Sequence, residues 1–392
     1  MPGGLDRMNV LVSRRLFVGG VLAAALDARG MVAQSGKGRP MRVLLGTMGK
    51  VSKGIYTASF DSATGVLGPM SLAAEVKAPT FLAEHHAKGE HLVYAVSEVE
   101  GAGAQVSAWT SVAGSTMLKE LNAVPTEGNG PTHLSLTPDG RCLAVANYGG
   151  GSFTSYHVEE DGRISQPVSH VQYTGSGPDK ERQAAPHAHS TQFSPDGKFL
   201  LVNDLGLDRI NVYRVNGATG AVTPNDPPYW AARPATGPRH IAFHPNGKWL
   251  YSVNELDSTV DQLHWDAAHG VITPVDHVST LKAGFPAHTA FAGEILLSHD
   301  GRHLYVGNRV GEDSIAVFDI DAQSGALKLV QLAPNGGKNT RHIALDPTGR
   351  WMLLSDQNSS AVVVLERDGT TGHLSEPKHT YPLDTVMFAL FV

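Results

Sequence analysis

The sequence of 392 residues contains a single cysteine, Cys142. One thiol cannot form an internal disulfide, and it leaves no Cys-x-x-Cys pair for a zinc site. Runs of basic residues are also missing, and the formal net charge is −6, which argues against a nucleic-acid-binding surface. Because 41% of the residues are hydrophobic and 17% are charged, the composition excludes a disordered chain. We therefore expect a folded protein that does not bind nucleic acid.

The first apolar run is too short to cross a membrane. Arg14 and Arg15 directly precede this run, which covers residues 17–26, whereas a membrane-spanning helix needs about 20 residues. The order of segments is typical of a signal peptide: a basic segment, a short apolar segment and then small residues with a cleavage site near Ala33. The paired arginines resemble the twin-arginine type.

The mature chain is expected to begin near residue 34. We predict a signal peptide at 1–33, a short linker at 34–40 and one domain at 41–392, with the mature protein in the periplasm. No later segment is apolar enough to span a membrane, so no membrane contact is expected after cleavage. A disordered or tethered extension on a cytoplasmic protein is the alternative.

Two turn patterns repeat along the chain at intervals of 47 to 58 residues. The first joins two apolar strands through a tight turn and centres on Gly89, Gly140, Gly197, Gly247, Gly301 and Gly349. The second places a glycine before an apolar pair, at Gly65, Gly114, Gly162, Gly220, Gly270, Gly325 and Gly372. Each pattern is a hairpin, so one period holds four strands. A period near 50 residues with four strands is typical of a β-propeller blade.

The numbers of copies of the two hairpin patterns predict how the blades close into a ring. Seven second hairpins but only six first ones leave one blade without its own first strand. The segment 41–47 looks like a second strand and 385–392 looks like a first strand, so their pairing completes that blade and removes free sheet edges. We predict an all-β, seven-bladed propeller closed in this way. The last full blade is expected to have strands at 340–345, 351–354 and 361–366, with a short fourth strand after Gly372.

The topology places candidate site residues at one rim. In each blade the start of the first strand and the end of the second lie at the same end, around the mouth of the central channel, where small ligands commonly bind. Arg239, Glu255 and Arg309 interrupt the repeat there, which favours a function for them. His187 and His189 are spaced to share one strand face, as in a metal pair. No carboxylate completes a ligand set, so no metal is expected.

Other polar residues at this rim fit a structural role as well. His133, His240 and His342 share one register in three blades, which favours a repeated hydrogen bond over catalysis. Asn254 and Asn308 end second strands, where asparagine commonly caps turns.

Several strings resemble the seven-bladed lactonase family, which includes cycloisomerase-type 6-phosphogluconolactonases and fungal carboxy-cis,cis-muconate cyclases. They lie at 175–183, 185–190, 237–240, 253–256 and 305–309, within a resemblance that spans 41–392. The resemblance implies a site without metal or cofactor, formed by one histidine, two arginines and a glutamate. Those residues are one of His187 and His189, together with Arg239, Arg309 and Glu255. The chain departs from the family at Gly307, at Ser298-His299 and in its signal peptide.

The resemblance also implies roles for these residues in lactone hydrolysis. A glutamate whose pKa is raised by partial burial can take a proton from water, and Glu255 is the candidate base. Arg239 and Arg309 would bind a carboxylate or phosphate of the substrate and the developing oxyanion. His187 or His189 would protonate the leaving ring oxygen.

Further residues complete the predicted substrate site. Lys180 and Arg182 belong to a long insertion that we expect to lean over the channel and hold an anionic group. The remaining candidates for substrate binding are His240, Asn254, Asn308 and Arg341.

Three functions are consistent with these residues. We expect hydrolysis of a sugar lactone by a monomer that binds a small lactone or carboxylate. A muconate-type lactonising cycloisomerase would use the same groups. A non-catalytic propeller that binds a ligand or a partner protein is the third alternative, because this fold has many functions.

The signal-peptide prediction can be tested by cell fractionation. Replacing Arg14 and Arg15 together by lysine should keep the protein in the cytoplasm, because twin-arginine recognition depends on the guanidinium groups. A double variant that still reaches the periplasm would show that the twin-arginine interpretation is wrong.

Overall fold

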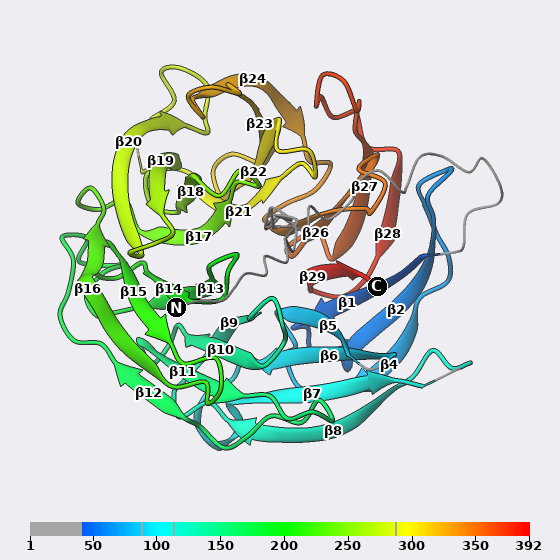
Figure 1. Cartoon of the computed structure of the whole chain (residues 1–392). Coiled ribbons are helices and arrows are strands. Elements are labelled where there is room, and N and C mark those ends of the chain that lie inside the picture. Colours follow the sequence, from blue (N-terminus) through cyan, green and yellow to red (C-terminus); the bar gives the residue numbers. More distant parts are fainter. Residues whose placement is uncertain (1–40, 88, 113, 287) are drawn as a thin grey trace, which may run out of the picture. The chain divides into compact units, whose positions relative to one another are not determined.

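The computed structural model describes residues 41–87, 89–112, 114–286 and 288–392 (Figure 1). The predicted signal peptide, 1–33, and linker, 34–40, lie outside the described residues. Within the described ranges the one helical element is a 3-10 helix, η1 (Gly101–Gly103), and no helix there is long and apolar enough to cross a membrane. The remaining regular structure is β-strand, so the predicted all-β class is confirmed.

Seven antiparallel sheets, the blades of a propeller, account for all the strands in the described ranges. Blade one has β1 (Met41–Thr47), β2 (Gly54–Asp61), β3 (Val66–Leu67), β4 (Ser71–Glu75) and β29 (Val386–Phe391). Blade two has β5 (Leu82–Ala87), β6 (Glu90–Ser97), β7 (Gln105–Ser111) and β8 (Leu118–Pro125). Blade three has β9 (Pro131–Leu136), β10 (Cys142–Asn147), β11 (Ser152–His157) and β12 (Ser169–Gln172).

The remaining four blades each contain four consecutive strands. Blade four has β13 (Ala188–Phe193), β14 (Phe199–Asp204), β15 (Arg209–Val215) and β16 (Val222–Ala231). Blade five has β17 (Pro238–Phe243), β18 (Trp249–Asn254), β19 (Thr259–Asp266) and β20 (Val271–Ser279). Blade six has β21 (Phe291–Leu297), β22 (His303–Arg309), β23 (Ser314–Ile320) and β24 (Leu327–Pro334). Blade seven has β25 (Thr340–Leu345), β26 (Trp351–Asp356), β27 (Ala361–Glu366) and β28 (His379–Pro382).

The last strand closes the ring. β29 pairs antiparallel with β1, and Figure 1 shows this red strand beside the blue one. The sheet order is β29-β1-β2-β3, and β4 also pairs with β2, so two short strands share the outer place of blade one. The predicted closure is therefore confirmed, and the outermost strand of the closing blade is divided.

The predicted short fourth strand of blade seven is confirmed, and the structure shows where it begins. The fourth strand of blade seven does not directly follow Gly372, where the structure has only an isolated bridge between Arg367 and Leu374. The strand itself, β28, begins at His379. Pro377 interrupts the segment between them and cannot donate a ladder hydrogen bond.

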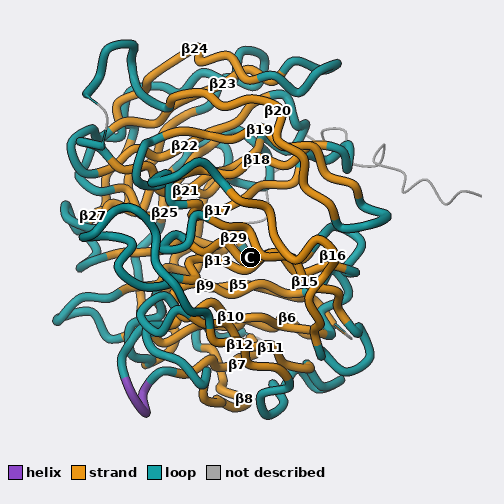
Figure 2. Tube along the Cα trace, turned by 90° about the vertical axis from the view of Figure 1, so that its left-hand side faces the viewer, coloured by secondary structure: helices purple, strands orange, loops and turns teal. Residues whose placement is uncertain are grey.

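The core consists of the contacts between neighbouring blades. Inner and middle strands are buried on both faces, so β10 and β26 are buried along their whole lengths. In the closing blade Phe391 contacts Phe60 edge to face, with ring centroids 5.1 Å apart, and both rings are nearly or fully buried. Figure 2 shows the connecting loops gathered at the two ends of the strands. Functional side chains are therefore confined to two loop-bearing faces and the central channel.

Closure predicts a large effect of one substitution in β29. Phe391→Ala should lower the free energy of unfolding by about 3 kcal/mol, because it removes a buried aromatic ring from the closing blade. Val275→Ala is the matched control: it truncates an exposed residue of β20 and should change stability by less than about 0.5 kcal/mol. Chemical denaturation followed by tryptophan fluorescence measures both. Equal stabilities for the two variants would contradict the role of β29 in closure.

Candidate active site

A β-bulge near the start of the innermost strand directs several side chains into the channel mouth. The pairing register shifts at this point in six of the seven blades. In β13, β17 and β25 the residues left out of the pairing are His189, Arg239 and Arg341. In β21 one such residue is Gly293, where a Cβ would lie 3.2 Å from Cδ of Arg309. The bulges thus aim these three side chains inward, as they do Thr132 of β9 and Met387 of β29, and the glycine leaves room for Arg309.

The ends of the second strands supply the other charged groups. Arg309 ends β22, Glu255 directly follows β18, Tyr148 follows β10 and Glu98 follows β6. All four side chains line the same cavity.

The Glu255 carboxylate lies at the centre of the site. It is 2% exposed and accepts hydrogen bonds from three guanidinium groups. Arg182 donates to Oε1, and Arg309 and Arg239 donate to Oε2, the latter through Nε at 3.1 Å. Nε2 of His189 lies 4.0 Å from Oε2. One buried carboxylate is therefore surrounded by three cations and an imidazole.

These cations reverse the expected shift of the Glu255 pKa. Burial alone raises this pKa, but Arg309, Arg239 and Arg182 together lower it to about 2. The expectation of a raised pKa is wrong, because the nearby positive charges stabilise the carboxylate more than desolvation destabilises it. Burial also lowers the pKa of Arg239, to about 9, and that of Arg309, yet both groups stay charged at neutral pH.

Arg182 reaches Glu255 from the long segment before β13. Its backbone N–H donates to the Asp179 carboxylate at 3.0 Å. The next residue, Gln183, is fully buried and donates to Oδ1 of Asp208 at 2.8 Å. The predicted insertion therefore does lean over the channel, and its fixed backbone directs the guanidinium of Arg182 toward the carboxylate.

A cavity of about 260 Å³ opens at the channel mouth. Its lining consists of Glu98, Thr132, Tyr148, Arg182, His189, Glu255, Phe291, Arg309, Val310 and Arg341. For the side chain of Arg341, the described part of the chain offers no hydrogen-bond or ion-pair partner. This guanidinium can therefore bind an anionic or strongly polar ligand without first breaking an ion pair.

A ring of aromatic and acidic side chains fills the channel below the cavity. Its members are Phe81, His133, His240, Glu294, His342 and Phe388. Nδ1 of His133 accepts a hydrogen bond from the backbone of Thr191 in the next blade, and Nδ1 of His342 accepts one from Ala389, each at 3.4 Å. The predicted repeated hydrogen bond is thus present in two of the three histidines.

His240 differs because blade six places Glu294 beside it. Nδ1 of His240 donates to Oε1 of Glu294 at 2.9 Å, which leaves Nε2 to accept a hydrogen bond from Nη1 of Arg239 at 3.4 Å. Oε2 of Glu294 is buried, has no hydrogen-bond partner within the described residues and lies 3.9 Å from Nε2 of His342. Glu294 thus fixes the tautomer of His240, which in turn contacts Arg239.

Of the two candidate histidines, only His189 lines the cavity. Burial, followed by the charge of Arg239, holds the pKa of His189 well below its usual value, so its imidazole is neutral at neutral pH. His187 precedes β13; its ring stacks on Tyr148 with centroids 4.5 Å apart, and its Nδ1 donates to the Tyr148 carbonyl at 3.0 Å. His189 also contacts the Tyr148 ring, with centroids 5.3 Å apart, but β13 begins between the two histidines and bulges at His189, so only His189 reaches the cavity.

Four residues predicted to bind substrate do not line the cavity. Lys180 is exposed on the insertion. Asn254 and Asn308 are fully buried, and their amides donate hydrogen bonds to neighbouring strand and loop groups. His240 lies in the ring beneath. Each asparagine directly precedes a residue of the cavity wall, Glu255 or Arg309, and its hydrogen bonds stabilise the neighbouring strands and loops instead.

Five residues of the cavity wall are not among the predicted site residues, namely Glu98, Thr132, Tyr148, Phe291 and Val310. Glu98 follows the second strand of blade two just as Glu255 follows that of blade five. Aligning the copy of the first turn pattern around Gly89 with the other copies would have placed Glu98 at the same position as Glu255. Phe291 lies under the guanidinium of Arg182, 4.9 Å from ring centroid to Cζ, and the sequence carries no periodic signal for that contact.

Known proteins share this architecture. Residues 42–391 match the family described as "Lactonase, 7-bladed beta-propeller". The chain is 34% identical to a 6-phosphogluconolactonase of Bacillus subtilis over 83% of its length and 90% of the relative's. It is 30% identical to a 6-phosphogluconolactonase of Formosa agariphila over 83% and 92%. The structure of the Pseudomonas aeruginosa periplasmic gluconolactonase superposes with a TM-score of 0.84 and 29% identity, covering 90% of this chain and 99% of that one.

Proposed function

Because the chain belongs to the family of seven-bladed β-propeller lactonases, we propose that it hydrolyses a sugar δ-lactone to the aldonic acid at the channel mouth. One observation carries the proposal: an ionised, buried carboxylate lines a cavity of about 260 Å³ and accepts hydrogen bonds from three guanidinium groups, of which those of Arg182 and Arg309 also line the cavity. Hydrolysis needs a base for water and donors for the oxyanion, and this constellation contains both. The names of the relatives favour hydrolysis over the lactonising direction.

The arginines are the proposed electrophilic groups. Arg309 is 6% exposed and reaches the cavity wall, so it can donate to a lactone carbonyl. As water attacks, the carbonyl oxygen becomes an oxyanion and attracts the guanidinium more strongly. Donors that are already fixed in a water-poor site stabilise such charge without reorganising.

Glu255 is the proposed proton shuttle. In the free protein its low pKa makes it a weak base, because Arg309 and Arg239 share its Oε2 atom. When Arg309 also donates to the oxyanion, its interaction with Oε2 weakens without a change of position, the pKa of Glu255 rises, and the carboxylate can take the proton that water loses. A new C–O bond forms from water, the ring C–O bond breaks, and Glu255 passes the same proton to the ring oxygen.

For His189 we propose a different role from the one first expected. A neutral imidazole is a poor proton donor, so we do not assign it the protonation of the ring oxygen. Its position 4.0 Å from Glu255 suits a hydrogen bond to the attacking water, which would hold that water between the two side chains.

The substrate class follows from the charges around the cavity. Arg341 has no acidic partner within the described residues. Arg182 lines the cavity and pairs with Glu255. Both can hold a phosphate or the hydroxyl groups of a sugar. The relatives include 6-phosphogluconolactonases and a gluconolactonase, so the assay should compare δ-gluconolactone with 6-phosphogluconolactone. We also propose export of the protein, since one similar structure is a periplasmic gluconolactonase.

Replacing the shuttle tests the mechanism directly. Glu255→Gln should lower kcat by roughly 10²–10⁴ on either lactone, because the amide cannot carry the proton. The amide keeps an oxygen that accepts hydrogen bonds from the arginines, so KM should change much less than kcat. The control is Glu366→Gln, which neutralises a carboxylate paired with Arg350 and Lys378 away from the cavity, and it should retain normal turnover. Initial rates are corrected for spontaneous ring opening.

Two results would contradict this proposal. Failure of the wild-type protein to open either lactone would remove the proposed activity. Turnover near the wild-type rate in a folded Glu255→Gln variant would remove the proposed shuttle while leaving the activity intact.

The pH dependence of kcat/KM distinguishes a catalytic carboxylate whose pKa is lowered from one whose pKa is raised. Because the folded pKa of Glu255 is about 2, the group stays ionised as the pH falls from 7 to 5. Burial and the nearby charge of Arg239 lower the pKa of His189, which favours its neutral imidazole as the pH falls. We therefore expect kcat/KM for δ-gluconolactone, whose lack of a phosphate avoids titration of the substrate, to be flat between pH 5 and 7. An acidic limb with a midpoint near pH 6 would indicate a base with a raised pKa instead.

A further inference from the structure

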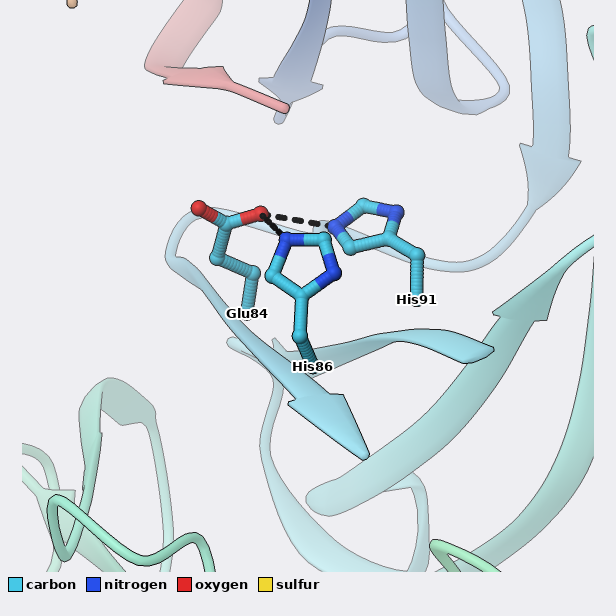
Figure 3. A group of neighbouring side chains, drawn as sticks. All are labelled: Glu84, His86 and His91. Atoms are coloured by element: carbon cyan, nitrogen blue, oxygen red, sulfur yellow. Dashed lines mark hydrogen bonds and ion pairs between the residues drawn. The ribbon is translucent and has the colours of Figure 1, made fainter. Parts of the chain in front are cut away.

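A cluster of possible metal ligands lies away from the cavity, at the hairpin that joins β5 to β6. Glu84 and His86 are two residues apart on β5, so their side chains share one face of the sheet. His91 lies directly opposite His86 on β6. Figure 3 shows all three side chains turned toward one another.

The distances within the cluster suit a small metal ion. Oε2 of Glu84 lies 2.7 Å from Nε2 of His91 and 3.7 Å from Nε2 of His86, and one ligand atom from each residue lies within 4.8 Å of the others. Two bonds of about 2.1 Å in a tetrahedral site place neighbouring ligand atoms about 3.4 Å apart. The two glutamate–histidine distances lie on either side of that value, so small side-chain rotations suffice.

A neighbouring hydroxyl supports the required form of His91. Oγ of Ser111 lies 3.0 Å from Nδ1 of His91. Without a metal, Nε2–H of His91 donates to Glu84. When a metal replaces that proton, the serine hydroxyl can accept the Nδ1–H and hold the tautomer whose Nε2 lone pair binds the ion. Metal-bound histidines commonly donate their other ring N–H in this way.

We propose that Glu84, His86 and His91 bind a divalent transition-metal ion, of which Zn²⁺ is the best match. Two imidazoles and a carboxylate are a common protein ligand set for Zn²⁺, with water in the fourth position. The side chain of His86 is 70% exposed, so solvent can reach this position. Across the described ranges no other group of three histidine, cysteine or acidic residues converges in this way.

The ion links two strands near the closure of the ring. Glu84 and His86 share their face of β5 with Leu82, which belongs to a buried cluster that also contains Leu44 and Phe388 of blade one. The metal therefore joins β5 to β6 beside the interface with the closing blade. Because the ligands converge only in the folded chain, binding stabilises the folded state.

Metal titration of the untagged mature protein, first dialysed against EDTA, tests the site. Calorimetry with ZnCl₂ should detect one site in the wild type, and the Co²⁺ complex should show visible d–d absorption. His86→Ala and Glu84→Gln should weaken binding at least tenfold and abolish the rise in Tm that Zn²⁺ causes in the wild type. Ser111→Ala should weaken binding by about 10- to 100-fold, as expected for a residue that orients a ligand.

His269→Ala is the matched control. It removes a histidine that lies 2.8 Å from Asp266 in an exposed pair without a third ligand, so Zn²⁺ binding should be unchanged. Lactone turnover should also be unchanged in His86→Ala, which leaves the cavity residues intact. Absence of Zn²⁺ and Co²⁺ binding by the wild type would overturn the proposal. So would equal affinities of the wild type and of both folded variants, His86→Ala and Glu84→Gln.

Discussion

Seven innermost strands converge on one channel, and the pairing of β29 with β1 makes that convergence complete. Closure forces the start of each first strand and the end of each second strand to the same mouth. Residues distant in sequence, such as His189, Glu255 and Arg341, therefore line one cavity. The bulges depend on this geometry too, because a side chain left out of the pairing turns toward the channel rather than toward a neighbouring blade.

The electrostatics of the site follow from this placement. Three guanidinium groups from blade five, blade six and the insertion meet one carboxylate with little solvent between them. Isolated, each buried charge would be costly, and removing one partner from a buried pair typically costs about 3–5 kcal/mol. Together they hold one another charged and in position. This arrangement gives a lactone carbonyl fixed donors and keeps the carboxylate ionised until substrate competes for its arginines.

Comparing corresponding positions of the repeat shows which residues link the blades and which support the site. At the ring below the cavity, His133 and His342 link neighbouring blades through backbone hydrogen bonds, as a structural repeat should. In blade six the corresponding place has Glu294, which bonds to His240 and through it supports Arg239. A residue that breaks the repeat can thus support the site through a neighbouring side chain. Its position in the sequence does not show whether it lines the cavity or lies behind it.

The sequence by itself determined the architecture, because a period near 50 residues and an uneven count of hairpins permit only one simple way to close the ring. It also predicted Arg239, Glu255 and Arg309 as candidate site residues, since these residues interrupt the repeat. Only the tertiary structure placed His189, and not His187, in the cavity wall, because the bulge at His189 leaves no mark in the sequence. It also decided the direction of the Glu255 pKa shift. That shift depends on the distances to three cations from separate segments, and no local pattern encodes those distances.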